Sequence, residues 1–288
     1  GLVMFGKIIT AIVTPFDENK NIDYRAFGTL LKKLEKEHTD SFVVCGTTGE
    51  APTLSFKEKL NLFHFAKKIV NKETKIIAGV GTNNTAETIK QIKILNETDV
   101  DAYLVVCPYY NKPSQEGLYM HFKLIDEVST KPIILYNVLS RCGVEINIPT
   151  LIRLFNDCNN IVGLKHASTN MQYIASIKKE LPRLLVYGGE DRYILDVFKN
   201  HGDGIISVLT NFYGNEVYEL IQDYLTNHFE NISLYEYIQT LAEIIFIESS
   251  PAPIKYILYR HHLILNQLRL PLVPLSTPFK QLIDNILD

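Results

Sequence analysis

The sequence has 288 residues, 46% hydrophobic and 21% charged, which is ordinary for a globular protein with a sizeable core. Its formal net charge of −3 gives no basic surface for nucleic acid or for acidic membranes. No apolar run approaches the roughly 20 residues that span a bilayer. The first residues show no secretory leader. We therefore expect a cytoplasmic protein with neither a nucleic-acid nor a membrane partner.

Short apolar runs of the length expected for buried strands recur along most of the chain. Eight of them can be counted: Ile8-Val13, Phe42-Cys45, Ile76-Val80, Ala102-Val106, Ile133-Tyr136, Ile161-Lys165, Leu184-Tyr187 and Gly204-Val208. Amphipathic segments with apolar residues at helical spacing alternate with them, as at Tyr24-Glu37, Phe56-Val70, Thr85-Leu95 and Gln115-Val128. Residues suited to cap a helix precede these four segments: Asp23, Ser55, Asn84 and Ser114. Eight such units predict a (β/α)8 TIM barrel rather than an open doubly wound sheet.

The alternation stops after Asn227, and three helical segments follow without strands between them: Leu234-Ile247, Pro253-His262 and Phe279-Leu287. We therefore predict a barrel domain over residues 1–228 and a C-terminal helical domain over residues 229–288. No GxGxxG follows the first strand, which disfavours dinucleotide binding. The four cysteines form no CxxC pair, and His261-His262 has no metal-ligand spacing, so we expect neither a disulfide framework nor a metal site.

The carboxyl ends of the strands are where a barrel of this kind places its active site. Lys165 ends the sixth apolar run, and a lysine amine that is withdrawn from water can act as a nucleophile and form a Schiff base with a ketone. Taken alone, the lysine is more simply interpreted as a strand that runs out into solvent. His166 is adjacent, but neighbouring strand positions face opposite ways, so we expect it to face the outer helices.

Other strand ends carry side chains that would complete such a site. Tyr136 and Tyr110, linked through Thr47, would supply a hydroxyl chain for proton transfer. The turn at Thr47-Thr48 offers backbone N–H groups to a carboxylate, and Arg141 could bind a second carboxylate through two hydrogen bonds. Each residue alone also fits a structural role, as a turn, a packed ring or a solvated cation. Their coincidence at one end of the barrel favours the catalytic interpretation.

Together these motifs resemble those of the dihydrodipicolinate synthase family, within the class I pyruvate-dependent aldolase superfamily that includes N-acetylneuraminate lyase. The segments that carry the resemblance are Gly46-Thr47-Thr48-Gly49-Glu50, Pro108 to Gly117, Tyr136-Asn137-Val138 with Ser140-Arg141, and Gly163-Leu164-Lys165. The similarity extends from Ala11 to Pro274. Only the combination of motifs is specific, since each alone is weak.

The resemblance implies a lyase that condenses pyruvate with L-aspartate 4-semialdehyde to give 4-hydroxy-tetrahydrodipicolinate, for lysine and diaminopimelate biosynthesis. It implies Lys165 as the Schiff-base residue and Tyr136 as the proton shuttle, coupled through Thr47 to Tyr110. In that family the second tyrosine reaches in from a neighbouring subunit of a homotetramer built as a dimer of dimers. Substrate contacts are implied for four more residues: Thr48, Arg141, Gly189 and Ile206. No cofactor or catalytic metal is implied.

Departures from the family pattern occur near the site. Leu139 stands where a proline usually precedes the Ser-Arg pair, His166 replaces a usual glutamate, and Ser168-Thr169 replace Thr-Gly. A lysine effector site is implied at Asn83, Glu87 and Tyr109. There, however, Phe56 and Lys59 stand where lysine-inhibited members often carry histidines.

Two alternatives remain open from the sequence. The first is a lyase or aldolase for a sialic acid or a keto-deoxy sugar acid, and Arg141 disfavours it because such enzymes admit a polyol beside small or apolar residues. The second is a catalytically silent relative that only binds a keto acid or serves an assembly. The complete set of five polar side chains disfavours this second alternative: Lys165, Tyr136, Tyr110, Thr47 and Arg141.

Overall fold

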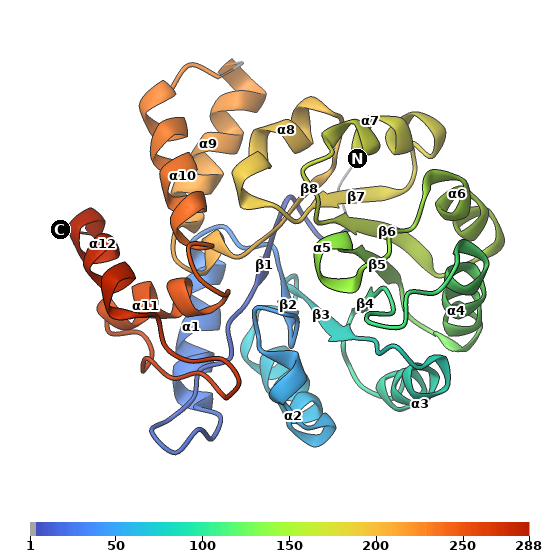
Figure 1. Ribbon diagram of the computed structural model, residues 1–288, viewed down its shortest axis with the longest axis horizontal. Coiled ribbons are helices and arrows are strands. Elements are labelled where there is room, and N and C mark those ends of the chain that lie inside the picture. Colours follow the sequence, from blue (N-terminus) through green and yellow to red (C-terminus); the bar gives the residue numbers. More distant parts are fainter. Residues whose placement is uncertain (1–3, 228, 288) are drawn as a thin grey trace.

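A computed structural model describes residues 4–227 and 229–287 of the chain. Eight parallel strands close into a barrel in chain order, and the last strand pairs with the first (Figure 1). The strands are β1 (Ile8–Ala11), β2 (Ser41–Val44), β3 (Lys75–Val80), β4 (Ala102–Val106), β5 (Ile133–Asn137), β6 (Ile161–His166), β7 (Leu185–Gly188) and β8 (Gly204–Ser207). The predicted (β/α)8 fold is confirmed, and the predicted strand ends differ by only one or two residues.

Helices cover the outside of the barrel (Figure 1). They are α1 (Tyr24–Lys36), α2 (Phe56–Ile69), α3 (Thr85–Leu95), α4 (Gln115–Val128), α6 (Ile148–Asp157), α7 (Met171–Glu180), α8 (Ile194–Lys199) and α9 (Gly214–Asn227). All four predicted capping residues accept a hydrogen bond from a backbone N–H of the first helical turn. At α2 the Glu58 side chain also bonds back to the N–H of Ser55, which completes a capping box.

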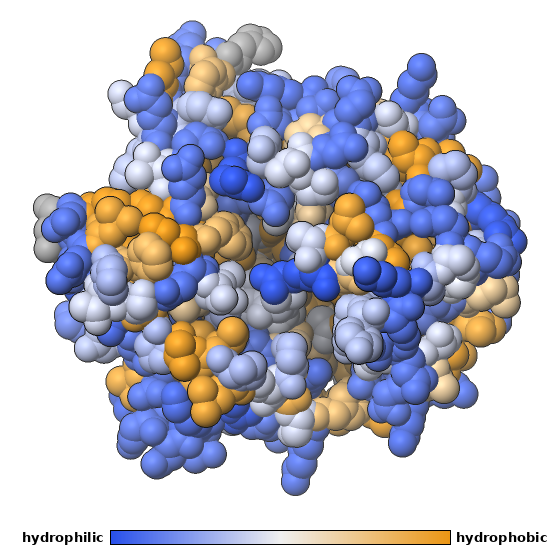
Figure 2. Space-filling view, viewed as in Figure 1, coloured by the Kyte–Doolittle hydropathy of each residue, from blue (hydrophilic) through white to orange (hydrophobic). Residues whose placement is uncertain are grey.

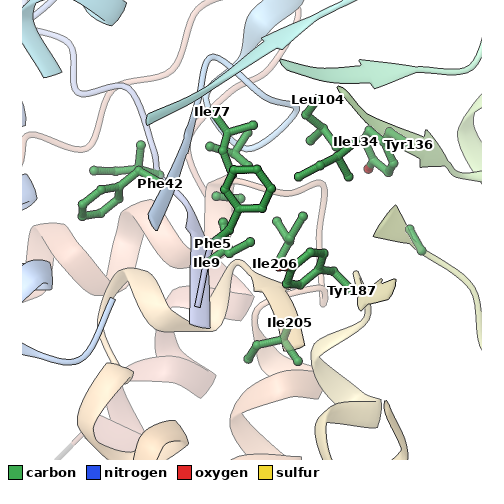
Figure 3. Close-up of a cluster of buried hydrophobic side chains, with 14 of the residues drawn as sticks. Phe5, Ile9, Phe42, Ile77, Leu104, Ile134, Tyr136, Tyr187, Ile205 and Ile206 are labelled. Atoms are coloured by element: carbon green, nitrogen blue, oxygen red, sulfur yellow. The ribbon is translucent and has the colours of Figure 1, made fainter. Parts of the chain in front are cut away.

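The interior of the barrel is filled by apolar side chains from most of its strands (Figure 3). Ile9, Ile77 and Ile206 are each no more than 2% exposed. Phe5, which precedes β1, is also part of the cluster, and Tyr136 lies at its edge (Figure 3). This apolar filling leaves the carboxyl ends of the strands as the expected place for an active site.

Three further helices form the C-terminal extension: α10 (Ile232–Ile244), α11 (Ala252–Arg260) and α12 (Thr277–Leu287). They lie to one side of the barrel, drawn in orange and red in Figure 1, and α10 packs against α9. The predicted helical extension is thus confirmed. The domain boundary after residue 228 stays a prediction, because that residue lies outside the described ranges. Within those ranges, none of the helices combines the length and apolar character needed to cross a bilayer.

Candidate active site

Lys165 lies inside the barrel and not in solvent. It is the penultimate residue of β6, and it pairs in register with Tyr136 of β5 and Tyr187 of β7. Its side chain is 8% exposed, and its Nζ lies 4.1 Å from the centre of the Tyr136 ring. An ammonium over the face of an aromatic ring is attracted by the ring's quadrupole, so the tyrosine fixes the position of the amine. The simpler interpretation, a strand that runs out into solvent, is wrong.

Gly189 lies directly against the lysine side chain. A Cβ built on this glycine would come 2.7 Å from Cε of Lys165 and 3.0 Å from Cβ of Ala167. The backbone N–H of Gly189 also donates to the carbonyl of His166 at 2.9 Å. Any larger residue here would displace the lysine or the end of β6, so the glycine is needed for close approach rather than for a turn alone.

The turn that follows β2 carries Thr47 and Thr48. Thr48 is 5% exposed and Thr47 is half-buried. Left-handed residues flank the turn, with φ of +59° at Cys45 and +61° at Glu50. The Thr14 hydroxyl donates to the carbonyl of Gly49 at 2.8 Å. These contacts hold the turn in one shape at the mouth of the barrel, as a preorganised carboxylate site requires.

Arg141 lies on a short helix, α5 (Leu139–Cys142), that directly follows β5. The helix ends at Gly143 in the left-handed conformation, with a φ of +77°. Arg141 and Leu139 are both exposed. In Figure 1, α5 lies over the centre of the barrel. Figure 2, in the same view, shows a hollow near this centre with strongly hydrophilic side chains at its rim. Leu139 in place of the usual proline is thus compatible with an ordered helical turn.

Tyr110 does not reach Lys165 within one chain. It is 88% exposed and adopts a φ of +76° in the loop after β4. Two side-chain amides hold this loop: Asn83 donates to the carbonyl of Tyr109 at 3.0 Å, and Asn111 donates to the carbonyl of Asn83 at 2.8 Å. Two of the three predicted effector residues are therefore neighbours. The third, Glu87, is exposed in the first turn of α3.

His166 faces away from the barrel interior, as predicted. Its ring stacks on Tyr173 of α7, with ring centres 4.5 Å apart and an interplanar angle of 2°. Its Nε2 donates to the carbonyl of Asn170 at 2.9 Å. Burial lowers the pKa of His166, which keeps the imidazole neutral. It therefore supports the outer helix α7 and points away from Lys165.

Asp191 is a site-shaping residue that the sequence reasoning missed. It is 4% exposed and accepts three hydrogen bonds from the segment that ends β8: Ser207 Oγ at 2.5 Å, Val208 N at 3.0 Å and Leu209 N at 3.1 Å. Burial nevertheless raises the pKa of its carboxyl. The aspartate holds the strand end directly after Ile206, which is itself 2% exposed. Its position just after β7 was the available signal.

The structure thus brings Lys165, Tyr136 and Gly189 into contact at the end of β5, β6 and β7. Ile206 lies in the neighbouring strand β8, and the turn with Thr47-Thr48 follows β2. A separate surface groove of about 780 Å³ lies between α1 and α2, lined by basic side chains such as Arg25 and Lys32. That groove is on the outside of the barrel, so we place the active site at the strand ends.

The comparisons with known proteins agree on one family. The sequence model of the Dihydrodipicolinate synthetase family matches residues 4–288. The chain is 41% identical over 274 residues to the 4-hydroxy-tetrahydrodipicolinate synthase of Bacillus subtilis, covering 94% of each protein.

Solved structures give the same result. The dihydrodipicolinate synthase of Bacillus anthracis superposes with a TM-score of 0.95 at 37% identity, covering 99% of this chain and 98% of that one. A structure described as the first monomeric dihydrodipicolinate synthase variant superposes with a TM-score of 0.94 at 35% identity, covering 99% and 96%. The chain belongs to the dihydrodipicolinate synthetase family.

Proposed function

We propose that this chain is a lyase that condenses pyruvate with L-aspartate 4-semialdehyde to 4-hydroxy-tetrahydrodipicolinate, a step in lysine and diaminopimelate biosynthesis. The observation that carries the proposal is the buried amine of Lys165, held over the ring of Tyr136 at the mouth of the barrel. An amine in this setting suits Schiff-base chemistry on a keto acid. The family match over residues 4–288 supports the same reaction.

Schiff-base formation needs a proton carrier beside the amine. Lys165 Nζ attacks the ketone carbon of pyruvate, the carbonyl oxygen is protonated and leaves as water, and an iminium remains. We assign the proton transfers to the hydroxyl of Tyr136, connected through Thr47 to Tyr110. We propose that Thr48 binds the pyruvate carboxylate and that the backbone of Gly189 and Ile206 lines the pocket.

The second half of the reaction forms a carbon–carbon bond. Loss of a methyl proton from the bound pyruvate gives an enamine, whose methylene carbon attacks the aldehyde carbon while the aldehyde oxygen takes up a proton. The amino group of the semialdehyde then displaces Lys165 and closes the six-membered ring. We assign the semialdehyde carboxylate to Arg141, whose guanidinium can donate two parallel hydrogen bonds. No cofactor or metal enters this scheme, and that remains a prediction.

Tyr110 connects this scheme to the assembly. Because it is 88% exposed in one chain, it can join the relay only when a neighbouring subunit presents it. We therefore propose a homotetramer built as a dimer of dimers, in the cytoplasm. A monomeric relative exists among the superposed structures, so the assembly has to be measured. Analytical ultracentrifugation of the purified chain is the direct test.

Borohydride trapping tests the proposed function. With pyruvate present, reduction should add the mass of the reduced pyruvate adduct to the peptide that contains Lys165. A coupled assay should then show turnover with aspartate 4-semialdehyde and none with N-acetylneuraminate. Trapping with turnover of the sugar acid alone would favour the lyase alternative, and absent trapping would favour the silent relative.

Replacing Arg141 with alanine should mainly impair use of the semialdehyde. The loss of a charge-assisted, two-pronged hydrogen bond to a carboxylate should lower kcat/KM for this substrate roughly 10- to 100-fold. The KM for pyruvate should stay within about twofold of the original value. Arg183→Ala removes another exposed arginine, which precedes β7 at the other end of the barrel, and is the matched control. Unchanged semialdehyde kinetics in Arg141→Ala would show that the assigned role is wrong.

Lysine should inhibit this enzyme weakly or not at all. Asn83, Glu87 and Tyr109 fit an effector site, but Lys59 adds a cation where inhibited relatives often carry histidine. A lysine ammonium in the effector site would be repelled by the ammonium of a bound lysine, which lowers the affinity for the effector. An inhibition constant below the millimolar range, measured at saturating pyruvate, would contradict this prediction. Lys59→His is the informative variant, because it should strengthen inhibition.

A further inference from the structure

The position of Arg141 depends on how its loop is closed. The guanidinium sits on an exposed side chain of α5, within the segment 138–145 that leaves β5 and returns at Ile146. This segment is tied to the residue that follows β4, because the thiol of Cys142 donates to the carbonyl of Cys107 at 3.3 Å. What fixes the loop's return point therefore decides where the guanidinium lies relative to Lys165.

Asn137, the last residue of β5, closes the loop on itself. It is 1% exposed; its side-chain oxygen accepts from the N–H of Ile146 at 2.9 Å, and its amide donates to the carbonyl of Ile146 at 3.4 Å. The residue that opens the loop thus also binds the residue that ends it. Asn137 directly follows Tyr136, so the position of the loop is fixed relative to the strand that carries the proposed proton shuttle.

Two other elements hold the same return point from outside. The hydroxyl of Tyr173, on α7, donates to the carbonyl of Ile146 at 2.8 Å. The amide of Gln115, the first residue of α4, donates to the carbonyl of Glu145 at 2.8 Å and accepts from the N–H of Asn147 at 3.1 Å. Side chains from a strand and two helices therefore converge on three consecutive backbone units. A loop needed only as a connection would not require this.

Tyr173 is in turn placed by the strand that carries Lys165. His166, the next residue on β6, stacks on the Tyr173 ring and donates to the carbonyl of Asn170. Asn170 caps the helix that bears the tyrosine, accepting from the N–H of Tyr173 at 3.3 Å. The inward face of β6 presents the amine and its outward face supports Tyr173. The departure from the family pattern at His166 therefore supplies an aromatic partner for Tyr173.

We propose that Tyr173 and Gln115, acting with Asn137, are positioning residues that set Arg141 for the carboxylate of the second substrate. The proposal rests on the proposed function, because it assumes that Arg141 binds the semialdehyde. Without the Tyr173 hydroxyl, the Ile146 carbonyl keeps the longer bond from Asn137; without the Gln115 amide, the Glu145 carbonyl and the Asn147 N–H lose their side-chain partner. Either loss weakens the anchoring of the return point and lets the loop shift. A shift of an ångström at a substrate-positioning group is enough to impair its use.

The test is the kinetics of Tyr173→Phe, which removes one hydroxyl and keeps the stacked ring. The KM for aspartate 4-semialdehyde should rise roughly three- to tenfold, as expected for one lost hydrogen bond acting through a positioned group. The KM for pyruvate, and borohydride trapping of pyruvate on Lys165, should remain within about twofold. Gln115→Met removes the hydrogen bonds of the Gln115 amide to Glu145 and Asn147, and it should give the same pattern of KM values. This second variant keeps the test decisive if Tyr173→Phe does not fold.

A control variant and a combined variant separate positioning from general weakening. Tyr103→Phe removes another buried hydroxyl hydrogen bond, to Asn96 at 2.8 Å near the start of β4, and should leave both KM values unchanged. Combined with Arg141→Ala, Tyr173→Phe should cause no further loss in semialdehyde use, since it acts through that arginine.

Three results would overturn the proposal. They are an unchanged semialdehyde KM in both single variants, an equal rise for both substrates, and a multiplicative loss in the combined variant. Failure of the proposed function gives a different result, because the unmodified protein would then show no pyruvate trapping or no turnover of the semialdehyde. The two failures are therefore distinguishable in one set of assays.

Discussion

Lys165→Ala should lower kcat by at least about 10³-fold and should abolish the mass increase that borohydride produces with pyruvate. The covalent intermediate requires the amine itself, and no other lysine contacts the ring of Tyr136 in the described residues. The side chain is buried against Gly189, and its truncation leaves an empty space there. A free amine from solvent would not be held in that space with the geometry of the lysine. Steady-state kinetics and intact-protein mass spectrometry measure the two effects.

Two variants separate the loss of the nucleophile from other changes. Lys165→Arg keeps a cation beside Tyr136 but cannot form the imine, so it should be as inactive as Lys165→Ala. Lys179→Ala removes an exposed lysine of α7 and should leave both trapping and turnover intact. If the adduct persisted in Lys165→Ala, another amine would be the Schiff-base residue, and the assignment made here would have to be abandoned.

The fold was predictable because its signals are local. Each strand is a short apolar run, and the residues that cap α1, α2, α3 and α4 stand directly before the helices they cap. Strand order followed as well, because each unit pairs with the next around a closed barrel. The short helix α5 was not predicted, since four residues ending in a glycine carry no periodic pattern.

The site was predictable only where the position of a residue along a strand decides which way its side chain points. Lys165 and His166 are neighbours, and the alternation of a strand sends one inward and the other toward α7. The roles of Asp191 and Tyr173 could not be predicted in this way. Asp191 binds a segment 16 to 18 residues away, and Tyr173 reaches a carbonyl 27 residues away, so both contacts depend on the closed barrel. Tyr110 adds a further limit, because its proposed partner lies in another chain.

Glu50 and Lys255 form a long-range contact that the sequence could not predict, and breaking it should strongly lower the stability of the protein. The two charged groups are 2.6 Å apart, 205 residues apart in sequence, and their side chains are 1% and 0% exposed. The ammonium also donates to the carbonyls of Thr14 and Gln267. Burial lowers the pKa of Lys255 to about 8. The lysine of α11 thereby ties the C-terminal extension to the turn that carries Thr48.

Lys255→Met should therefore destabilise the protein by about 3–5 kcal/mol, because it leaves the buried carboxylate of Glu50 without its counter-charge, with only the N–H of Arg269 among the described residues still donating to it. Urea unfolding measures this, and Lys123→Met, which breaks the exposed Lys123–Glu127 pair on α4, should change stability far less. Adding Glu50→Leu to Lys255→Met should recover part of the loss, since no unpaired charge then remains. Protein that stays folded should also show a raised KM for pyruvate, because Glu50 ends the turn that we assign to the pyruvate carboxylate. A loss below about 1 kcal/mol would mean that water reaches the carboxylate once the lysine is gone, and that the extension does not brace the turn.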